Sequence, residues 1–232
     1  MLKIKYLFVI ALFFYSLQNS AQTVLLNVDR TNERVYDRGP NQKKFTQAFI
    51  KFGFVIPPDE EGARIKYGGS VSCGFGVRKK FKVSSLYSLG WEIQIEFTDY
   101  KLKQDSTKVF SAGKYYDTQR IDVTSLGVGF FNRLNLDPQR GNYMGYYLDL
   151  GLTGRAAFST KEVYKYNVGY GDATVKVNHL NYANYFHADT FVRIGLSRLS
   201  VWATYRISNL FKEKAKLPEL PRITVGIELG LY

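Results

Sequence analysis

Apolar and polar residues alternate along most of the chain with a period of two. In residues 87–98, apolar side chains take every second position, and Ser, Gly, Glu, Gln and Thr take the positions between them. This period over twelve residues predicts a β-strand with one apolar and one polar face. Strands of soluble proteins run to about 5–6 residues, whereas a tilted membrane-spanning strand needs about 9–11. The length therefore favours a strand that crosses a membrane.

The same alternation recurs in seven further segments. Three of them are regular, and they comprise residues 144–155, 185–196 and 223–231. Four are weaker, and they comprise residues 46–56, 69–78, 119–131 and 199–211. The 119–131 segment changes phase near Ser125, which predicts a β-bulge. The pattern thus predicts an all-β fold of eight strands.

The connections between these strands alternate in length. Long or medium connections are expected at residues 57–67, 101–118, 159–178 and 212–221, and shorter ones at 79–82, 132–142 and 197–200. This order places all the long connections at one end of an up-and-down meander, as in outer-membrane barrels. Residues 45–232 are therefore predicted to form an eight-stranded antiparallel up-and-down transmembrane β-barrel.

A soluble, lipocalin-like barrel has the same strand order, with its apolar face turned inward. Here the polar face is rich in Gly, Ser, Thr and Tyr and lacks the dense Lys and Glu cover of a soluble exterior. Aromatic residues recur near the predicted strand ends, as an interfacial girdle requires. They are Tyr87, Trp91, Tyr143, Tyr146, Tyr182, Tyr185, Tyr205 and Tyr232. These features favour the membrane barrel over the soluble one.

The N-terminus has the parts of a secretory signal peptide in residues 1–21. Lys3 and Lys5 precede an apolar run over residues 6–15, and small and polar residues lead to Ala21. A buried N-terminal strand or helix is the alternative interpretation. Residues 22–44 are polar and contain Gly-Pro, so we expect a short periplasmic segment without a core of its own.

Composition narrows the class of protein further. The chain carries 17 Phe, 18 Tyr and 2 Trp in 232 residues, which excludes a disordered protein. Its longest apolar runs fall short of the roughly 18–20 residues of a membrane helix, which excludes a helical bundle. Cys73 is the only cysteine, so no intrachain disulfide exists, and its place in an alternating segment predicts an outward or packing position.

The last predicted strand carries a pattern of its own. Thr224 is followed two positions later by Gly226, and apolar Leu229 and Leu231 stand three and five positions after that glycine. This pattern resembles the C-terminal assembly signal of outer-membrane barrels, and Tyr232 adds a terminal aromatic residue. The resemblance implies insertion by a barrel-assembly machinery.

The whole exported chain resembles small outer-membrane β-barrel proteins of Bacteroidota-type bacteria. That group includes PorT-like barrels and is similar in plan to the OmpX and OmpA barrels. The resemblance implies residence in the outer membrane of a Gram-negative cell, with both mature termini in the periplasm. It also implies a structural or accessory role in an envelope or secretion assembly.

Charged residues gather on the polar face of the predicted strands. They are Lys51, Glu92, Glu96, Asp149, Arg155, His187, Asp189, Arg193, Arg206 and Glu228. The interior of an eight-stranded barrel is just wide enough for side chains to fill, and unpaired buried charges are costly. We therefore expect a charge network that plugs the lumen. A narrow channel for protons or ions is the alternative.

Some eight-stranded barrels modify lipid A by acyl hydrolysis or transfer, so an enzyme is a second alternative. That chemistry needs a nucleophile with a nearby His and an orienting carboxylate. His179 lies near Asp172 and Ser159 in the sequence, while His187 has no Ser two positions on. We expect no enzyme, no catalytic residues, no cofactor and no metal site, since two His and one Cys do not make a zinc site of usual spacing.

The chain has a net charge of +12, and much of the positive charge lies in predicted connections. The lysines concerned are Lys101, Lys103, Lys108, Lys114, Lys161, Lys165, Lys176, Lys212, Lys214 and Lys216. Beside an outer leaflet they would attract outer-membrane lipid, including the phosphates of lipopolysaccharide. A solvated loop surface is the alternative interpretation. Export removes the chain from nucleic acid, so we expect no nucleic-acid partner.

Overall fold

The computed structural model describes residues 39–57, 63–105, 110, 115–167, 169 and 171–231. The predicted signal peptide, most of the predicted periplasmic segment and Tyr232 lie outside these residues. The strands are β1 (Lys44–Ile56), β2 (Val71–Lys82), β3 (Tyr87–Leu102), β4 (Thr118–Asn135), β5 (Tyr146–Asn167), β6 (Asp172–Asn178), β7 (Phe186–Leu196), β8 (Leu199–Arg206) and β9 (Ile223–Leu231). A 3-10 turn, η3 (Glu213–Ala215), lies between β8 and β9.

Eight of these strands close into a ring. Each pairs with its neighbours in the order β1, β2, β3, β4, β5, β7, β8 and β9, and β9 pairs with β1 to complete the circle. Every pairing is antiparallel. The predicted eight-stranded antiparallel barrel is therefore confirmed. Within the described ranges, no helix is both long and apolar enough to cross a lipid bilayer.

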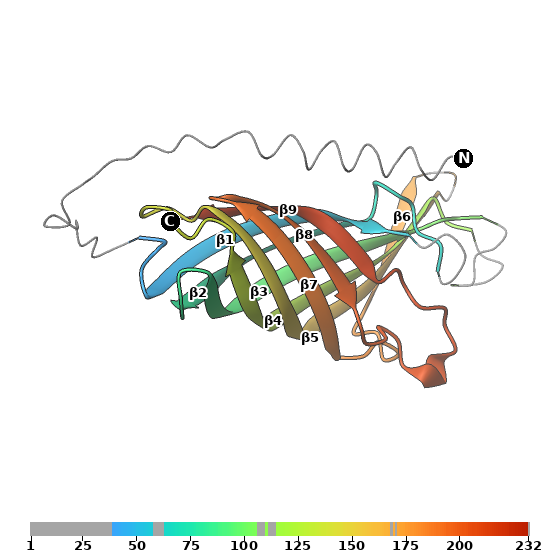
Figure 1. Ribbon diagram of the computed structural model, residues 1–232. Coiled ribbons are helices and arrows are strands. Elements are labelled where there is room, and N and C mark those ends of the chain that lie inside the picture. The colour runs from blue at the N-terminus through green and yellow to red at the C-terminus, as the bar shows by residue number, and fades with distance from the viewer. Residues whose placement is uncertain are drawn as a thin grey trace, which may run out of the picture. The chain divides into compact units, whose positions relative to one another are not determined.

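The two ends of the barrel differ (Figure 1). Short turns join β2 to β3 and β7 to β8 at one end, where β9 also finishes near the C-terminus. At the other end lie the longer connections after β1, β3 and β8, together with β6. We call these the turn end and the long-connection end. The alternating connection lengths expected from the sequence thus correspond to the observed topology.

The two faces of the wall are the reverse of those in a soluble protein. On β3, outward Leu89, Ile93 and Phe97 are exposed, whereas inward Glu92 and Glu96 are 1% and 5% exposed. The same alternation of exposed apolar and buried polar positions follows the other ring strands. A soluble lipocalin-like barrel would have the opposite arrangement. The wall therefore presents an apolar surface to its surroundings.

Inward aromatic rings lie beside inward glycines of neighbouring strands. Direct register partners of this kind are Phe49 and Gly76, Phe131 and Gly90, Phe191 and Gly151, Tyr147 and Gly195, and Trp202 and Gly226. A Cβ on Gly195 would lie 2.1 Å from Cζ of Tyr147, so the ring occupies the space that a side chain would need. The rings thus occupy the space that the glycines leave free and help to fill the lumen.

An apolar core closes the long-connection end. Inward side chains at the strand ends pack with side chains from the connections, among them Phe110, Leu180, Leu210, Phe211 and Leu220. This group includes Tyr100 and Ile121 from the wall. The connections thus fold over the lumen and bury their apolar side chains inside it.

The structure corrects one predicted connection. The segment expected to be a loop, 159–178, continues β5 to Asn167 and returns as β6, which among the described strands pairs with β5 alone. The hairpin stands beyond the ring at the long-connection end (Figure 1). The register of β4 against β5 shifts between Thr124 and Ser125, where the bulge was predicted, but the extra residue is Phe158 of β5. The predicted change of phase within β4 is wrong, because its odd-numbered positions stay buried along the whole strand.

Smaller corrections concern strand boundaries and single residues. Residues 79–82 belong to β2 rather than to a turn, and β8 ends at Arg206 rather than continuing to residue 211. Met144, expected on an outward face, precedes β5 and is buried. Tyr182, expected in the aromatic girdle, packs against the apolar core, and its hydroxyl donates to Glu162 at 2.7 Å. Burial and that hydrogen bond raise the pKa of Tyr182, so its hydroxyl remains protonated.

Candidate functional site

A network of ion pairs fills the middle of the lumen. Arg78 donates from Nε to Glu92 at 2.9 Å and from Nη2 to Glu228 at 2.9 Å. Arg193 reaches the same two carboxylates, at 3.0 Å and 3.3 Å, so the four side chains form a closed set. They come from β2, β3, β7 and β9 and are at most 4% exposed. These ion pairs thus connect strands on opposite sides of the barrel.

The network continues toward the turn end through Asp149. Arg193 donates to its Oδ2 at 2.9 Å, and Arg133 binds both of its oxygens, at 2.6 Å and 2.8 Å. The guanidinium of Arg133 also lies 3.7 Å from the centre of the Tyr147 ring. Bidentate pairing and stacking are the contacts that favour Arg over Lys at such a position.

A second cluster lies on the other side of the network, around Glu96. This carboxylate accepts from Arg155 at 2.7 Å and from Ser72 at 3.0 Å, and it also pairs with Lys51. Arg155 in turn pairs with Asp189. Each charge in this cluster therefore has an opposite charge beside it.

Arg206 connects the lumen to the connection between β8 and β9. Its Nη2 donates to Glu219 at 2.6 Å and to the carbonyl of Leu220 at 2.8 Å, and its Nη1 donates to the Tyr100 hydroxyl at 3.2 Å. Glu219 also accepts from the backbone N–H of Leu210 at 2.8 Å. This ion pair fixes the connection over the end of the barrel.

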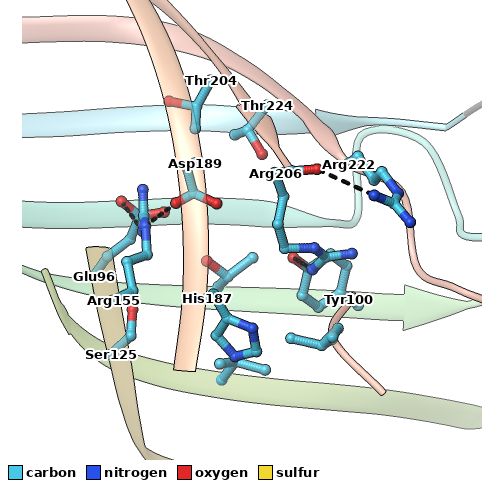
Figure 2. A pocket seen from close by; sticks show the side chains of 13 residues that line it. Glu96, Tyr100, Ser125, Arg155, His187, Asp189, Thr204, Arg206, Arg222 and Thr224 are labelled. Carbon is cyan, nitrogen blue, oxygen red and sulfur yellow. Dashed lines mark hydrogen bonds and ion pairs between the residues drawn. The ribbon is translucent and has the colours of Figure 1, made fainter. Parts of the chain in front are cut away.

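A cavity of about 40 Å³ lies between the Glu96 cluster and Arg206. Figure 2 shows the His187 ring in this cavity, between the Arg155 group and the pair of Arg206 and Tyr100. The ring is 6% exposed, and neither of its nitrogens has a hydrogen-bond partner among the described residues. A polar cavity of this size has room for a few water molecules, which we expect to satisfy the ring.

All ten charged residues selected from the sequence lie on the inward face and are buried. Eight of them take part in the ion pairs of the two lumen clusters. Arg206 pairs instead with Glu219 of the connection between β8 and β9, and His187 lies beside them without an ion pair among the described residues. Sequence reasoning missed Arg78, the last residue of the predicted strand 69–78, and Arg133, in the predicted connection 132–142. Arg78 has the inward phase of β2, so continuing the alternation past Gly76 would have found it.

The residues of the predicted C-terminal signal take two faces of β9. Thr224 lines the cavity, and Gly226 lies opposite Trp202. Leu229 and Leu231 are exposed on the outward face. Tyr232 lies outside the described residues.

The residues considered for acyl transfer are not assembled into a triad. His179 follows β6, whereas Asp172 begins it, and the seven residues of this strand separate them by about 20 Å at 3.3 Å per residue. The backbone N–H of His179 donates to Thr160, which places it beside Ser159 but far from that carboxylate. Within the described ranges, no group of three or more His, Cys, Asp and Glu side chains is arranged to hold a metal ion.

Comparison with solved structures shows what the chain resembles in fold. The chain is similar to Ail, the attachment invasion locus protein of Yersinia pestis, with 9% sequence identity and a TM-score of 0.34, over 82% of this chain and 99% of Ail. No protein-family model and no curated protein matches the sequence. The class of fold, a small closed antiparallel β-barrel with a charged lumen, follows from the strand pairing and burial in this chain.

Proposed function

We propose that this chain is an integral β-barrel protein of the outer membrane of a Gram-negative bacterium. The observation that carries the proposal is the reversed wall, with an apolar outward face and a buried ion-pair network inside. Water would disfavour the outward face, and lipid would stabilise it. The closed ring satisfies the wall's backbone hydrogen bonds, which is the condition for β-structure in a bilayer.

The proposed orientation places the turn end in the periplasm and the long-connection end outside the cell. Outer-membrane barrels have short periplasmic turns and longer outer connections, and this chain has the same asymmetry. Both mature termini then lie in the periplasm, in agreement with the signal peptide predicted for residues 1–21.

The proposed role is structural or accessory, within an envelope or secretion assembly. The filled lumen supports this role over a channel, because side chains from opposite walls meet at its centre. The separation of His179 from Asp172 supports it over a lipid A-modifying enzyme. The proposed partners are outer-membrane lipid, the barrel-assembly machinery during insertion and an envelope protein complex.

Membrane location is tested by fractionating cells that express a tagged copy. We expect the protein in the outer membrane after carbonate extraction, with a faster electrophoretic mobility before boiling than after it. Recovery in the soluble periplasmic fraction, with no shift on boiling, would reject the proposed membrane barrel.

The accessory role is tested by crosslinking in the native membrane, purification in a mild detergent and mass spectrometry. A stoichiometric envelope protein supports the role. Recovery of the barrel with lipid alone, after efficient crosslinking, contradicts it. Protease digestion of intact cells tests the orientation, because only the long-connection end should then be cut.

A further inference from the structure

The outward face of the wall carries a row of basic residues at the long-connection end. Lys66 donates its backbone N–H to Lys101, Lys101 is the register partner of Arg120, and Arg120 is the partner of Val163. Val163 is in turn the partner of Lys176 on β6. Four of the five positions in this row, across adjacent chain segments, are therefore basic.

Two further lysines extend the row along β5. Lys161 and Lys165 stand two residues before and after Val163, so they share its face, and both are exposed. Val163 itself is 3% exposed, which gives the surface a buried apolar centre. We call Lys66, Lys101, Arg120, Lys161, Lys165 and Lys176 the basic patch.

The acidic residues near the basic patch are fewer. Asp99 and Asp122 lie on the same face, and Arg120 is 3.4 Å from each of them. Asp172 lies four residues from Lys176, at the tip of the hairpin. Six basic and three acidic side chains leave a clear positive excess. Lys161, Lys165 and Lys176 form no salt bridge with the described residues.

The basic patch lies just beyond the apolar part of the wall. The last exposed apolar residues before it are Phe97 on β3, Leu126 on β4 and Phe158 on β5. Lys101 stands four residues after Phe97, and Lys161 stands three after Phe158. On strands tilted by about 40°, these steps raise the charges by roughly 8–10 Å along the membrane normal. The headgroup layer is about 5–8 Å thick on each side of the hydrocarbon core, so Lys101 and Lys161 stand at its outer boundary.

We propose that the basic patch binds the phosphate groups of lipid A, the phosphorylated glycolipid, in the leaflet around the long-connection end. The proposal rests on the membrane location and orientation proposed above. Lys101 and Lys176 are separated by three strand spacings, about 14 Å. A rigid headgroup with two phosphates can contact Lys101 on one side of the patch and Lys176 on the other. A phospholipid with a single phosphodiester can contact one side alone. Binding would also hold the β5–β6 hairpin against the leaflet, since three of the patch lysines belong to it.

The test compares lipid binding to the full mature chain refolded in detergent. The probes are diphosphoryl lipid A, lipid A without its phosphates, and phosphatidylglycerol, and the readout is retention by native mass spectrometry and titration. The variant is Lys161→Gln/Lys165→Gln/Lys176→Gln. The matched control is Lys43→Gln/Lys44→Gln/Lys79→Gln, which removes equal charge at the turn end. The electrophoretic shift on boiling verifies that each protein is folded.

Each basic side chain near an anionic surface changes binding by about fivefold, so we expect the variant to bind diphosphoryl lipid A roughly tenfold to a hundredfold more weakly. The control should stay within about twofold of the unmodified chain, and added salt should weaken the difference. Equal binding of the dephosphorylated lipid, tighter binding of phosphatidylglycerol, or an equal loss in the control would each overturn the proposal. Recovery of the protein in the soluble fraction of cells would instead reject the proposed function. The binding assay does not depend on fractionation, so the two failures are distinguishable.

Discussion

At the scale of single residues, the charged side chains of the lumen are buried in groups in which positive and negative charges pair. Arg193 contacts Glu92, Asp149 and Glu228 at once, and all four side chains are nearly inaccessible to water. Such a set gains little over a well-packed apolar core, but breaking it is costly because the remaining charges stay buried. The network therefore fixes which strands face one another as well as contributing to stability.

Replacing Arg193 with Met should destabilise the barrel strongly. Three carboxylates would lose a partner in the interior, and we expect a loss of about 3–5 kcal/mol in the free energy of unfolding. Urea unfolding of the refolded protein in lipid vesicles, followed by Trp fluorescence, measures this loss. Arg64→Met is the matched control, because its pair with Asp105 at 3.9 Å is exposed and contributes under about 1 kcal/mol. Equal losses in the two variants would contradict a central role for the network.

The contact between Tyr147 and Gly195 gives a second prediction. Gly195→Ala should cost about 1–3 kcal/mol, since its Cβ would overlap the phenol ring and force the ring or the wall to move. Gly154→Ala is the control, because a Cβ there meets no atom within 4 Å. The same urea unfolding measures both variants. An equal loss of stability in Gly154→Ala would show that replacing a strand glycine has this cost without any overlap with the Tyr147 ring.

The sequence predicted which face these residues take but not which of them pair. Alternation alone places Arg193 and Glu228 inward, since both have the polar phase of their strands. Their partners depend on the stagger between strands, which a period of two does not contain. Arg78 was missed for a related reason: three further basic residues follow it within β2, and a cluster of positive charge resembles a solvated turn.

At the scale of elements, the hairpin of β5 and β6 is separate from ring closure. β5 pairs with β7 through residues 146–156, below the part of β5 that pairs with β6. The sequence was interpreted as a loop here because residues 159–178 lack a continuous apolar face. Charged Lys161, Glu162 and Lys165 interrupt both phases of the alternation. A strand that stands beyond an apolar environment needs no apolar face, so the hydrophobic pattern could not reveal it.

Shortening this hairpin should therefore leave the barrel folded. Lys165 and Thr174 are register partners, so residues 166–173 can be replaced by Asn-Gly as a two-residue turn. We expect the unfolding free energy to change by less than about 1 kcal/mol, and the shift in mobility on boiling to persist. Removal of residues 224–231 is the contrasting deletion, because β9 pairs with both β1 and β8 and its loss opens the ring. A shortened hairpin that abolishes folding would show that β6 is needed for ring closure.

At the scale of the whole molecule, aromatic rings, ion pairs and an apolar core fill the space inside the wall. The rings lie among the ion pairs, since the Arg78 guanidinium is 4.4 Å from the centre of the Phe49 ring and that of Arg193 is 5.0 Å from the centre of the Phe191 ring. The apolar core closes the long-connection end, and Arg206 binds Glu219 in the connection between β8 and β9. Among the described residues, one cavity beside the Glu96 cluster measures about 40 Å³ and another beside Arg193 about 10 Å³, and each holds at most a few water molecules.

This filling predicts that the refolded protein does not conduct in a planar lipid bilayer. Ions would have to displace side chains whose charges are already paired, such as Arg78 with Glu228 at 2.9 Å. Current recordings at voltages of both signs, on preparations whose insertion is verified by the electrophoretic shift, should show only the baseline of the lipid. Sustained unitary steps in the unmodified protein would reject the plugged lumen and favour the narrow channel. Steps that appear only in Arg193→Met would instead support the network as the element that closes the barrel.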